Sequence, residues 1–398
     1  MTSATYVLLL ATLLNFVNYI DRFILSAVLP RIKSDLLLND FQLGMLANAF
    51  LVAYFITSPL FGRLGDRQSR PRLIAVGVAL WSVATAAAGL ARTFMQLVAA
   101  RAGVGVGEAA YATISPALLA DIFPAERRGR AFAIFYVAIP VGAAIGFLLG
   151  GALERAFGWR AAFVVVGLPG LALAILAARM PDPRTANDVR TAGGIETVAM
   201  TLRTLARNRR YAGTVLGYAT YTFAIGGLAV WMPTFLERVR GLELATADFL
   251  VGAVTVVAGL GGTFVGGYLG DRLTARVREG HLWLSGVSTL AAVVPAWLAL
   301  TSSTPATYQA SFFVAEFLLF LSTGPINVVI VSAVPEGMRA MAMAVSIFVI
   351  HALGDAISPP MIGLLADSRG LAQAVLTVPV AIAVSGAIWT MTAATRSG

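Results

Sequence analysis

The sequence contains no cysteine, only two histidines and few charged residues. The absence of cysteine excludes disulfides, thiolate metal sites and haem attachment through a CxxCH motif. Charged residues make up 12% of the 398 residues and hydrophobic residues 58%, and the mean hydropathy is +0.81. A water-soluble domain of this length could not carry so much apolar surface, so the composition indicates an integral membrane protein.

Motifs of the main enzyme classes are also missing. There is no Gly-x-x-x-x-Gly-Lys-Ser/Thr loop, which argues against an ATP-driven pump, and no Gly-x-Ser-x-Gly nucleophile elbow. His281 and His351 are the only histidines, and no carboxylate cluster with metal-ligand spacing accompanies them. We therefore expect no enzymatic activity, no cofactor and no metal.

The net charge of +9 does not indicate nucleic-acid binding, because the basic residues are not gathered on one face or helix. Most of the 29 Lys and Arg residues lie in alternate loops, in a central linker and at the C-terminus. The positive-inside rule places those segments in the cytoplasm. We expect both termini to be cytoplasmic and most arginines of these cytoplasmic clusters to fix the topology and contact lipid phosphates.

Long apolar runs bounded by proline, glycine and charge predict an all-α protein with twelve transmembrane helices. The first six are expected at 5–33, 40–62, 72–91, 93–122, 130–157 and 160–180. The second six are expected at 209–237, 245–270, 282–299, 305–334, 338–366 and 371–394. The chain is thereby divided into an N-terminal six-helix bundle (1–180), a polar cytoplasmic linker (181–208) and a C-terminal six-helix bundle (209–398).

The two bundles look like duplicates. Gly62-Arg-Leu-Gly-Asp66-Arg67 follows the second helix, and Gly267-Tyr-Leu-Gly-Asp271-Arg272 follows the eighth, about half the chain further on. Two pseudo-symmetric halves with a substrate site between them, near the membrane midplane, are a known plan for transporters. Because one chain supplies both halves, we expect a monomer.

Four ionisable residues fall inside the predicted helices of the first half: Asp21 and Arg22 on helix one, and Arg101 and Glu108 on helix four. Ionisable residues cost about 2.5 to 3.5 kcal/mol at the centre of a membrane helix, so each is a functional candidate. Arg101 and Glu108 share a helix face but are separated by about 10 Å of rise. We therefore expect each of them to pair across to helix one.

Two readings of this cluster remain open. In the first, conformation decides whether Asp21 or Glu108 holds a proton, and Arg22 and Arg101 bind an anionic head group. In the second, the residues form static ion pairs that fix helix one against helix four.

Other polar or aromatic residues are candidates for lining a central cavity, although core packing explains most buried aromatics. These candidates are Asn15, Asn18, Tyr111, Tyr218, Tyr221 and Glu316. His351 and Asp355, four apart on helix eleven, are expected to form a hydrogen-bonded pair, with a pH sensor as the alternative.

Glycines at helical spacing indicate close helix contacts. Gly103 and Gly107 predict one such contact on helix four. On helix five, Gly142, Gly146 and Gly150 form a ridge that favours sliding against the corresponding helix of the second half, with tight static packing as the alternative.

The segment from Gly62 to Arg72 resembles the signature loop of the major facilitator superfamily, with Ser69 where that pattern commonly has glycine. The resemblance implies the major facilitator fold and a gate latch that favours the state closed to the cytoplasm. In this latch Gly62 is expected to allow close helix approach. The latch residues would be Gly62, Asp66, Arg67, Arg70, Gly267, Asp271 and Arg272.

Three further segments, 18–23, 107–116 and 135–142, resemble the Spinster family of major facilitators. They read NYIDRF, GEAAYATISP and FYVAIPVG. Members of that family are implicated in moving lysophospholipids and sphingosine-1-phosphate, some with proton dependence. The resemblance implies a bacterial-type homologue in an inner membrane, with Asp21, Arg22, Arg101 and Glu108 as coupling or head-group residues.

The sequence thus predicts a proton-coupled secondary transporter of an amphiphilic, anionic, lipid-like solute. Two alternatives stay open. The protein could carry a small organic anion or drug-like compound, or it could be a lipid scramblase that works without a gradient.

Overall fold

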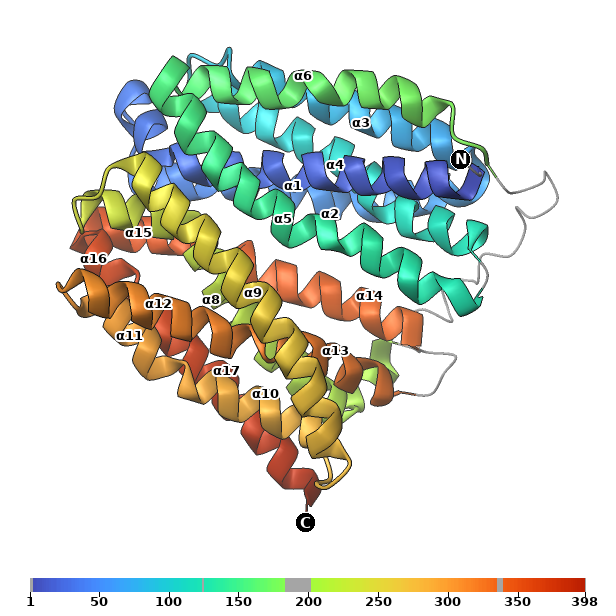
Figure 1. Cartoon of the computed structure of the whole chain (residues 1–398), viewed down its shortest axis with the longest axis vertical. Coiled ribbons are helices and arrows are strands. Elements are labelled where there is room, and N and C mark those ends of the chain that lie inside the picture. The colour runs from blue at the N-terminus through green and yellow to red at the C-terminus, as the bar shows by residue number, and fades with distance from the viewer. Residues whose placement is uncertain (1–2, 124, 183–201, 335–338, 398) are drawn as a thin grey trace. The chain divides into compact units, whose positions relative to one another are not determined.

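The computed structural model describes residues 3–123, 125–182, 202–334 and 339–397, and these residues form helices without strands (Figure 1). Eleven segments are long and apolar enough to cross a bilayer. A further helix, α4 (Phe94–Ile122), has 29 residues and carries Arg101 and Glu108. Together these segments account for the twelve predicted helices of a multi-pass integral membrane protein.

The chain forms two compact units. The first comprises Met1–Thr191 together with Leu236–Gly252, and the second comprises Ala192–Phe235 and Ala253–Gly398. The segment Leu236–Gly252, which falls within the predicted C-terminal bundle, thus belongs to the first unit. Most of the predicted linker, 183–201, lies outside the described residues, and 202–207 is helical.

The first unit contains six long helices. They are α1 (Ser3–Leu36), α2 (Asp40–Arg67), α3 (Arg70–Ala88), α4, α5 (Ala125–Phe157) and α6 (Trp159–Ala178). Helix α1 packs on α5, α2 packs on α4, and α3 packs on both α4 and α6 (Figure 1). Asn39 caps α2 through a capping box with Gln42. The predicted second span is confirmed as Asp40–Gly62, and α2 continues beyond it to Arg67, so that the signature motif lies on its last turns.

Glycines set the closest helix contacts in this unit. A Cβ on Gly107 would lie 2.5 Å from the carbonyl oxygen of Gly77, so the predicted contact of helix four is confirmed, with α3 as its partner. A Cβ on Gly146 would lie 2.8 Å from the carbonyl oxygen of Ile20. The ridge of helix five therefore packs tightly on α1 of the same unit. Sliding against the second half stays a prediction.

The second unit contains most of α8 (Arg209–Arg238) and of α9 (Leu244–Thr274), and its remaining helices are broken. Predicted helix nine is α10 (Gly280–Ala291) and α11 (Val293–Thr301), and helix ten is α12 (Pro305–Phe320) and α13 (Thr323–Ser332). Helix eleven is α14 (Arg339–Ile350), the π-helical turn η2 (His351–Asp355) and α15 (Ser358–Arg369). Helix twelve is α16 (Leu371–Ala374) and α17 (Thr377–Ser397).

Each of these breaks lies about four residues before a proline. The prolines are Pro295, Pro325, Pro359 and Pro379. A proline inside a helix lacks the N–H that bonds to the carbonyl four residues earlier, and its ring clashes with that carbonyl. The four predicted spans are each confirmed as a candidate membrane span, and each is interrupted shortly before a proline.

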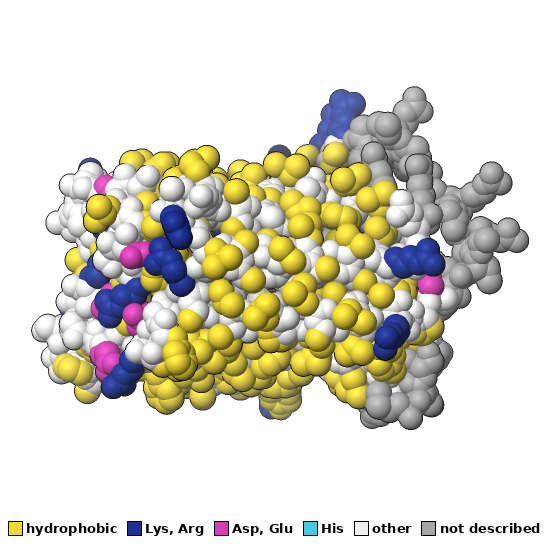
Figure 2. Space-filling view, turned by 90° about the horizontal axis from the view of Figure 1, so that it is seen from above, with side chains coloured by type: hydrophobic (Ala, Val, Ile, Leu, Met, Phe, Trp, Pro, Cys, Tyr) yellow, Lys and Arg dark blue, Asp and Glu magenta, His cyan; other side chains and the backbone are white. Residues whose placement is uncertain are grey.

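The surface fits a lipid environment. Figure 2 shows hydrophobic side chains across the middle of one face, with Lys, Arg, Asp and Glu gathered toward its two ends. Large apolar side chains such as Phe264, Ile56 and Met391 are 77%, 69% and 68% exposed. Such exposure is expected where hydrocarbon replaces water as the solvent.

Candidate functional site

The four ionisable residues predicted from the sequence lie together in the first unit. Asp21, Arg101 and Glu108 are fully buried, with 1%, 1% and 0% of their surfaces exposed. The Arg22 side chain is 21% exposed. Of the four, Arg22 is therefore the residue that reaches accessible space.

The charges pair between α1 and α4, as predicted. Arg22 Nε donates to Glu108 Oε2 at 2.7 Å, while Arg101 Nη1 lies 3.5 Å from Asp21 Oδ1. Thr85 of α3 donates its hydroxyl to Asp21 Oδ2. The first pair is a close charge-assisted hydrogen bond, and the second is a looser ion pair.

Aromatic rings surround the two arginines. The Arg22 guanidinium lies 4.9 Å from the ring centroid of Tyr19, 5.0 Å from that of Phe50 and 5.3 Å from that of Tyr54. Arg101 lies 5.3 Å from the same Phe50 ring. Ring faces stabilise cations where water is scarce. Sequence reasoning missed Phe50 and Tyr54, because an aromatic residue in an apolar helix gives no distinguishing signal.

The positive and negative charges of the cluster are equal in number, because it contains two acidic and two basic side chains. If both carboxylates are ionised, the formal charge of the four residues is zero. A proton on either carboxyl group leaves one guanidinium charge uncompensated, which favours an anion. Glu108 Oε1 has no hydrogen-bond partner among the described residues, so this carboxyl group has an oxygen available for a proton.

Several predicted cavity residues make fixed contacts inside the first unit. The Asn15 amide donates to the carbonyl oxygen of Phe135 at 2.9 Å. Tyr111 donates its hydroxyl to the carbonyl oxygen of Ala11 at 2.6 Å and lies in the hydrophobic core. Asn18 is 1% exposed. A role for these three residues in lining a cavity stays a prediction.

The predicted latch of the first half is described in part. Arg70 forms an ion pair with Asp121, while the side chains of Asp66 and Arg67 lie outside the described residues. The close approach expected at Gly62 was wrong, since a Cβ there would lie 3.7 Å from Thr113. The tight position is Gly65, where a Cβ would lie 3.0 Å from Ile114.

The second copy of this motif lies at the end of α9. The Asp271 side chain is 82% exposed, and its Oδ1 lies 3.5 Å from His281 Nε2. Arg272 donates to the Tyr268 hydroxyl at 3.1 Å, and a Cβ on Gly267 would meet no atom within 4 Å. The latch role of both copies stays a prediction.

Candidate residues of the second unit include an aromatic cluster. The rings of Tyr218, Tyr221 and Trp389 have centroids 5.6 to 6.4 Å apart. Tyr221 donates its hydroxyl to the carbonyl oxygen of Leu319 at 3.0 Å, and Glu316 is 6% exposed. A role for these tyrosines and Glu316 in lining a cavity stays a prediction.

The histidine and aspartate of helix eleven lie on the π-helical turn η2. His351 Nδ1 lies 2.9 Å from Asp355 Oδ2 and 3.0 Å from Asp355 Oδ1. The predicted hydrogen-bonded pair is confirmed. A function as a pH sensor stays a prediction.

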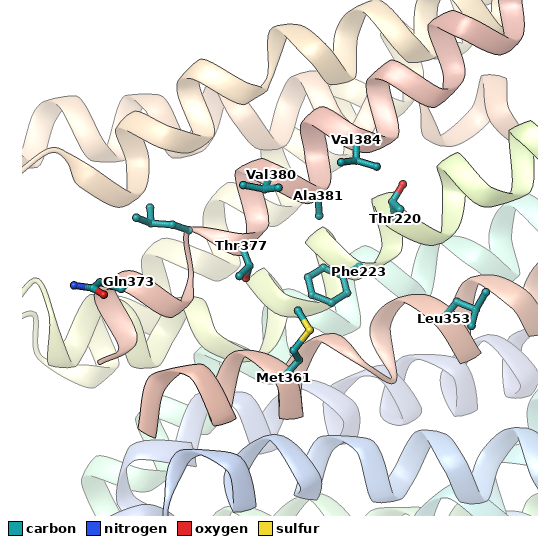
Figure 3. Close-up of a pocket in the computed structure, with 10 residues that line it drawn as sticks. Thr220, Phe223, Leu353, Met361, Gln373, Thr377, Val380, Ala381 and Val384 are labelled. Atoms are coloured by element: carbon teal, nitrogen blue, oxygen red, sulfur yellow. The ribbon is translucent and has the colours of Figure 1, made fainter. Parts of the chain in front are cut away.

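An apolar pocket of about 460 Å³ lies beside this turn in the second unit (Figure 3). Phe223 of α8, Leu353 of η2, Met361 of α15 and Val380 of α17 contribute to its wall. Thr220, Thr377 and Gln373 add a few polar groups. The lining suits an alkyl chain, and Tyr218, Tyr221 and Glu316 do not take part in it.

Comparison with known proteins gives consistent matches. The family model of the Major Facilitator Superfamily matches residues 11–359. Protein spinster homolog 3 of Danio rerio is 34% identical over 375 residues, which cover 89% of this chain and 75% of that protein. The "Probable sphingolipid transporter spinster homolog 2" of Arabidopsis thaliana is 33% identical over 351 residues, covering 84% and 72%.

Solved structures share the fold. The crystal structure of a bacterial homolog to the human lysosomal transporter Spinster, in an inward-facing and unoccupied conformation, superposes with a TM-score of 0.87. The alignment covers 99% of this chain and 98% of that one, at 24% identity. The D-xylose-proton symporter gives a TM-score of 0.78 at 16% identity, covering 98% and 97%.

Proposed function

The chain belongs to the Spinster family of the major facilitator superfamily, and we propose that it is a proton-coupled transporter of an amphiphilic, anionic, lipid-like solute. Transport would proceed by alternating access. The chain would act as a monomer with both termini in the cytoplasm. The two signature motifs would act as gate latches on the cytoplasmic side.

The observation that carries this proposal is the Arg22–Glu108 pair. Arg22 is partly exposed and donates to a fully buried carboxyl group at 2.7 Å. A deprotonated Glu108 competes with an anionic head group for this guanidinium. A protonated Glu108 leaves Arg22 free to bind the anion, which guanidinium groups bind with two parallel hydrogen bonds.

Proton and anion binding therefore favour one another at this site. Because such coupling is reciprocal, a bound anion would raise the fraction of Glu108 that holds a proton. Both ligands would then cross together, as in a symporter. Arg101 is 1% exposed and contacts Asp21, so it would fix α4 against α1 while Arg22 contacts the solute.

Two observations support a lipid-like solute over a small polar anion. The pocket of the second unit is lined mostly by apolar side chains, which suit an alkyl chain (Figure 3). The relative from Arabidopsis thaliana is named as a probable sphingolipid transporter. A small organic anion is the second candidate, because Arg22 alone would also bind one.

The test is uptake of a lysophospholipid into proteoliposomes with an imposed proton gradient. We expect gradient-driven uptake by the wild type and loss of the gradient dependence in Glu108→Gln. The matched control is Glu243→Gln, which removes an acid that is 54% exposed. It should transport like the wild type.

Other outcomes would contradict the proposal in separate ways. Wild-type uptake that does not depend on the proton gradient would indicate a scramblase. Retained coupling in Glu108→Gln would remove this residue as the proton carrier. Failure of lysolipids beside successful uptake of a small organic anion would favour the second candidate.

A further inference from the structure

Asp248, on the first turns of α9, is a buried acid that the proposed transport cycle does not use. Its side chain is 0% exposed, and neither carboxyl oxygen has a hydrogen-bond partner among the described residues. It packs on α5 at Gly151, where a Cβ would lie 2.7 Å from Asp248 Oδ2. Both residues belong to the first unit.

Two further carboxylates would repel a negative charge on Asp248. They belong to Glu154 of α5 and Glu237 at the end of α8. Both are bound by the same guanidinium. Arg31 Nε donates to Glu154 at 2.9 Å, and Arg31 Nη1 lies 3.0 Å from Glu237. One positive charge thus serves two carboxylates and leaves none for the third.

Three other basic side chains of the first unit are engaged with acids other than Asp248. Lys33 and Arg238 both contact Asp40, each at 2.7 Å. Arg155 lies 3.3 Å from Glu243. With all three carboxylates of the Arg31 group ionised, its formal charge would be −2, with one charge fully buried and unpaired. A buried unpaired carboxylate is costly, and a group in that position takes up a proton instead.

We propose that Asp248 is a proton-binding site separate from Glu108, which holds a proton while Leu236–Gly252 packs against α5 and releases it when this segment moves away. The two sites are well apart. Arg31, which binds Glu154 and Glu237 beside the first site, and Arg22, which binds Glu108 at the second, are nine residues apart on α1, or about 13 Å along the helix.

A proton fits the site better than a metal ion does. The described part of the chain contains no group of three His, Cys, Asp or Glu residues placed to hold a metal. Arg31 already binds Glu154 and Glu237, so a cation would have to displace a guanidinium. Gly151 also brings α5 against the carboxyl group, which leaves little room for a hydrated ion.

The proposal predicts how this end of the protein responds to pH. Separation of the segment from α5 would release one proton. The ratio of molecules with a separated segment to molecules with a packed one should therefore rise tenfold for each unit of increasing pH. This pH dependence has two limits. The lower limit is the pH at which Asp248 ionises when exposed, and the upper limit is the pH at which it ionises when the segment is packed. This inference does not depend on the proposed solute.

The absence of cysteine makes a distance measurement straightforward. Spin labels at Phe157→Cys on α5 and Thr246→Cys on α9, both exposed positions, report the separation by pulsed electron resonance. In purified protein, we expect the long-distance fraction to grow as pH rises. Adding Asp248→Asn, a neutral mimic of the protonated acid, should hold the short distance at every pH.

A matched control and a second measurement complete the test. Adding Glu243→Gln, on the same segment, should leave the pH response unchanged. The infrared spectrum at neutral pH should contain a protonated-carboxyl band that Asp248→Asn removes. The absence of any such band would overturn the proposal even if that variant did not fold. A distance between the labels that does not change with pH would also overturn the proposal. So would a pH response in Asp248→Asn as large as that of the protein with Asp248 intact.

Discussion

Replacing Arg22 with glutamine tests whether the central ion pair holds α1 and α4 together. The change removes the guanidinium that donates to Glu108 at 2.7 Å and leaves a carboxyl group with 0% exposure. At an effective dielectric constant of about 20, two unit charges at this distance attract by about 6 kcal/mol. Desolvation offsets part of that attraction, and removing one partner of a buried pair costs about 3 to 5 kcal/mol.

The free energy of unfolding can be measured by titration with sodium dodecyl sulfate in mixed micelles. We expect Arg22→Gln to lower it by about 3 to 5 kcal/mol, as for other broken buried pairs. The double variant Arg22→Gln with Glu108→Gln should recover at least about 2 kcal/mol, because it leaves no unpaired charge and two amides can bond. Lower pH should also reduce the loss in the single variant, since protonation neutralises Glu108.

The matched control is Arg155→Gln. Arg155 pairs with Glu243 at 3.3 Å, but their side chains are 70% and 54% exposed. Removing such a surface pair costs at most about 1 kcal/mol. The reasoning would be refuted if Arg22→Gln were no less stable than this control, or if the double variant were no more stable than Arg22→Gln.

Two further predictions concern helix packing and topology. Gly146→Ala should destabilise the protein by about 1 to 3 kcal/mol through overpacking, whereas Gly62→Ala, with 3.7 Å of room, should not. Unfolding in the same micelles compares them, and equal effects would contradict the packing argument. In intact cells, a membrane-impermeant maleimide should label Phe157→Cys, while Thr395→Cys should react only after permeabilisation. The reverse pattern would invert the proposed orientation.

Much of the first unit was predictable because its helices follow local rules. Apolar runs of membrane length locate the helices, and polar residues are so costly in lipid that Asp21, Arg22, Arg101 and Glu108 stood out. Their pairing between α1 and α4 followed from the rise along α4, which keeps Arg101 and Glu108 too far apart to bond with each other. The contacts in the structure confirm that pairing.

Other parts of the site gave no signal along the sequence. Phe50 and Tyr54 are two aromatics among many, and only packing brings their rings to the Arg22 guanidinium. Asp248 reads as an ordinary acid near a helix start, where acids are common. Its burial depends on Gly151, which lies almost a hundred residues earlier in the sequence.

The sequence by itself predicted that the chain crosses a membrane twelve times and that four charged residues lie inside helices of the first half, and it shows one motif in both halves. These properties follow from composition and spacing, which act along the chain. Tertiary structure alone decided which prolines interrupt a helix. Pro116 and Pro140 lie inside unbroken α4 and α5, while Pro295 and Pro325 follow breaks. It also decided which charges lack a partner, because burial and pairing depend on neighbours that only the folded chain supplies.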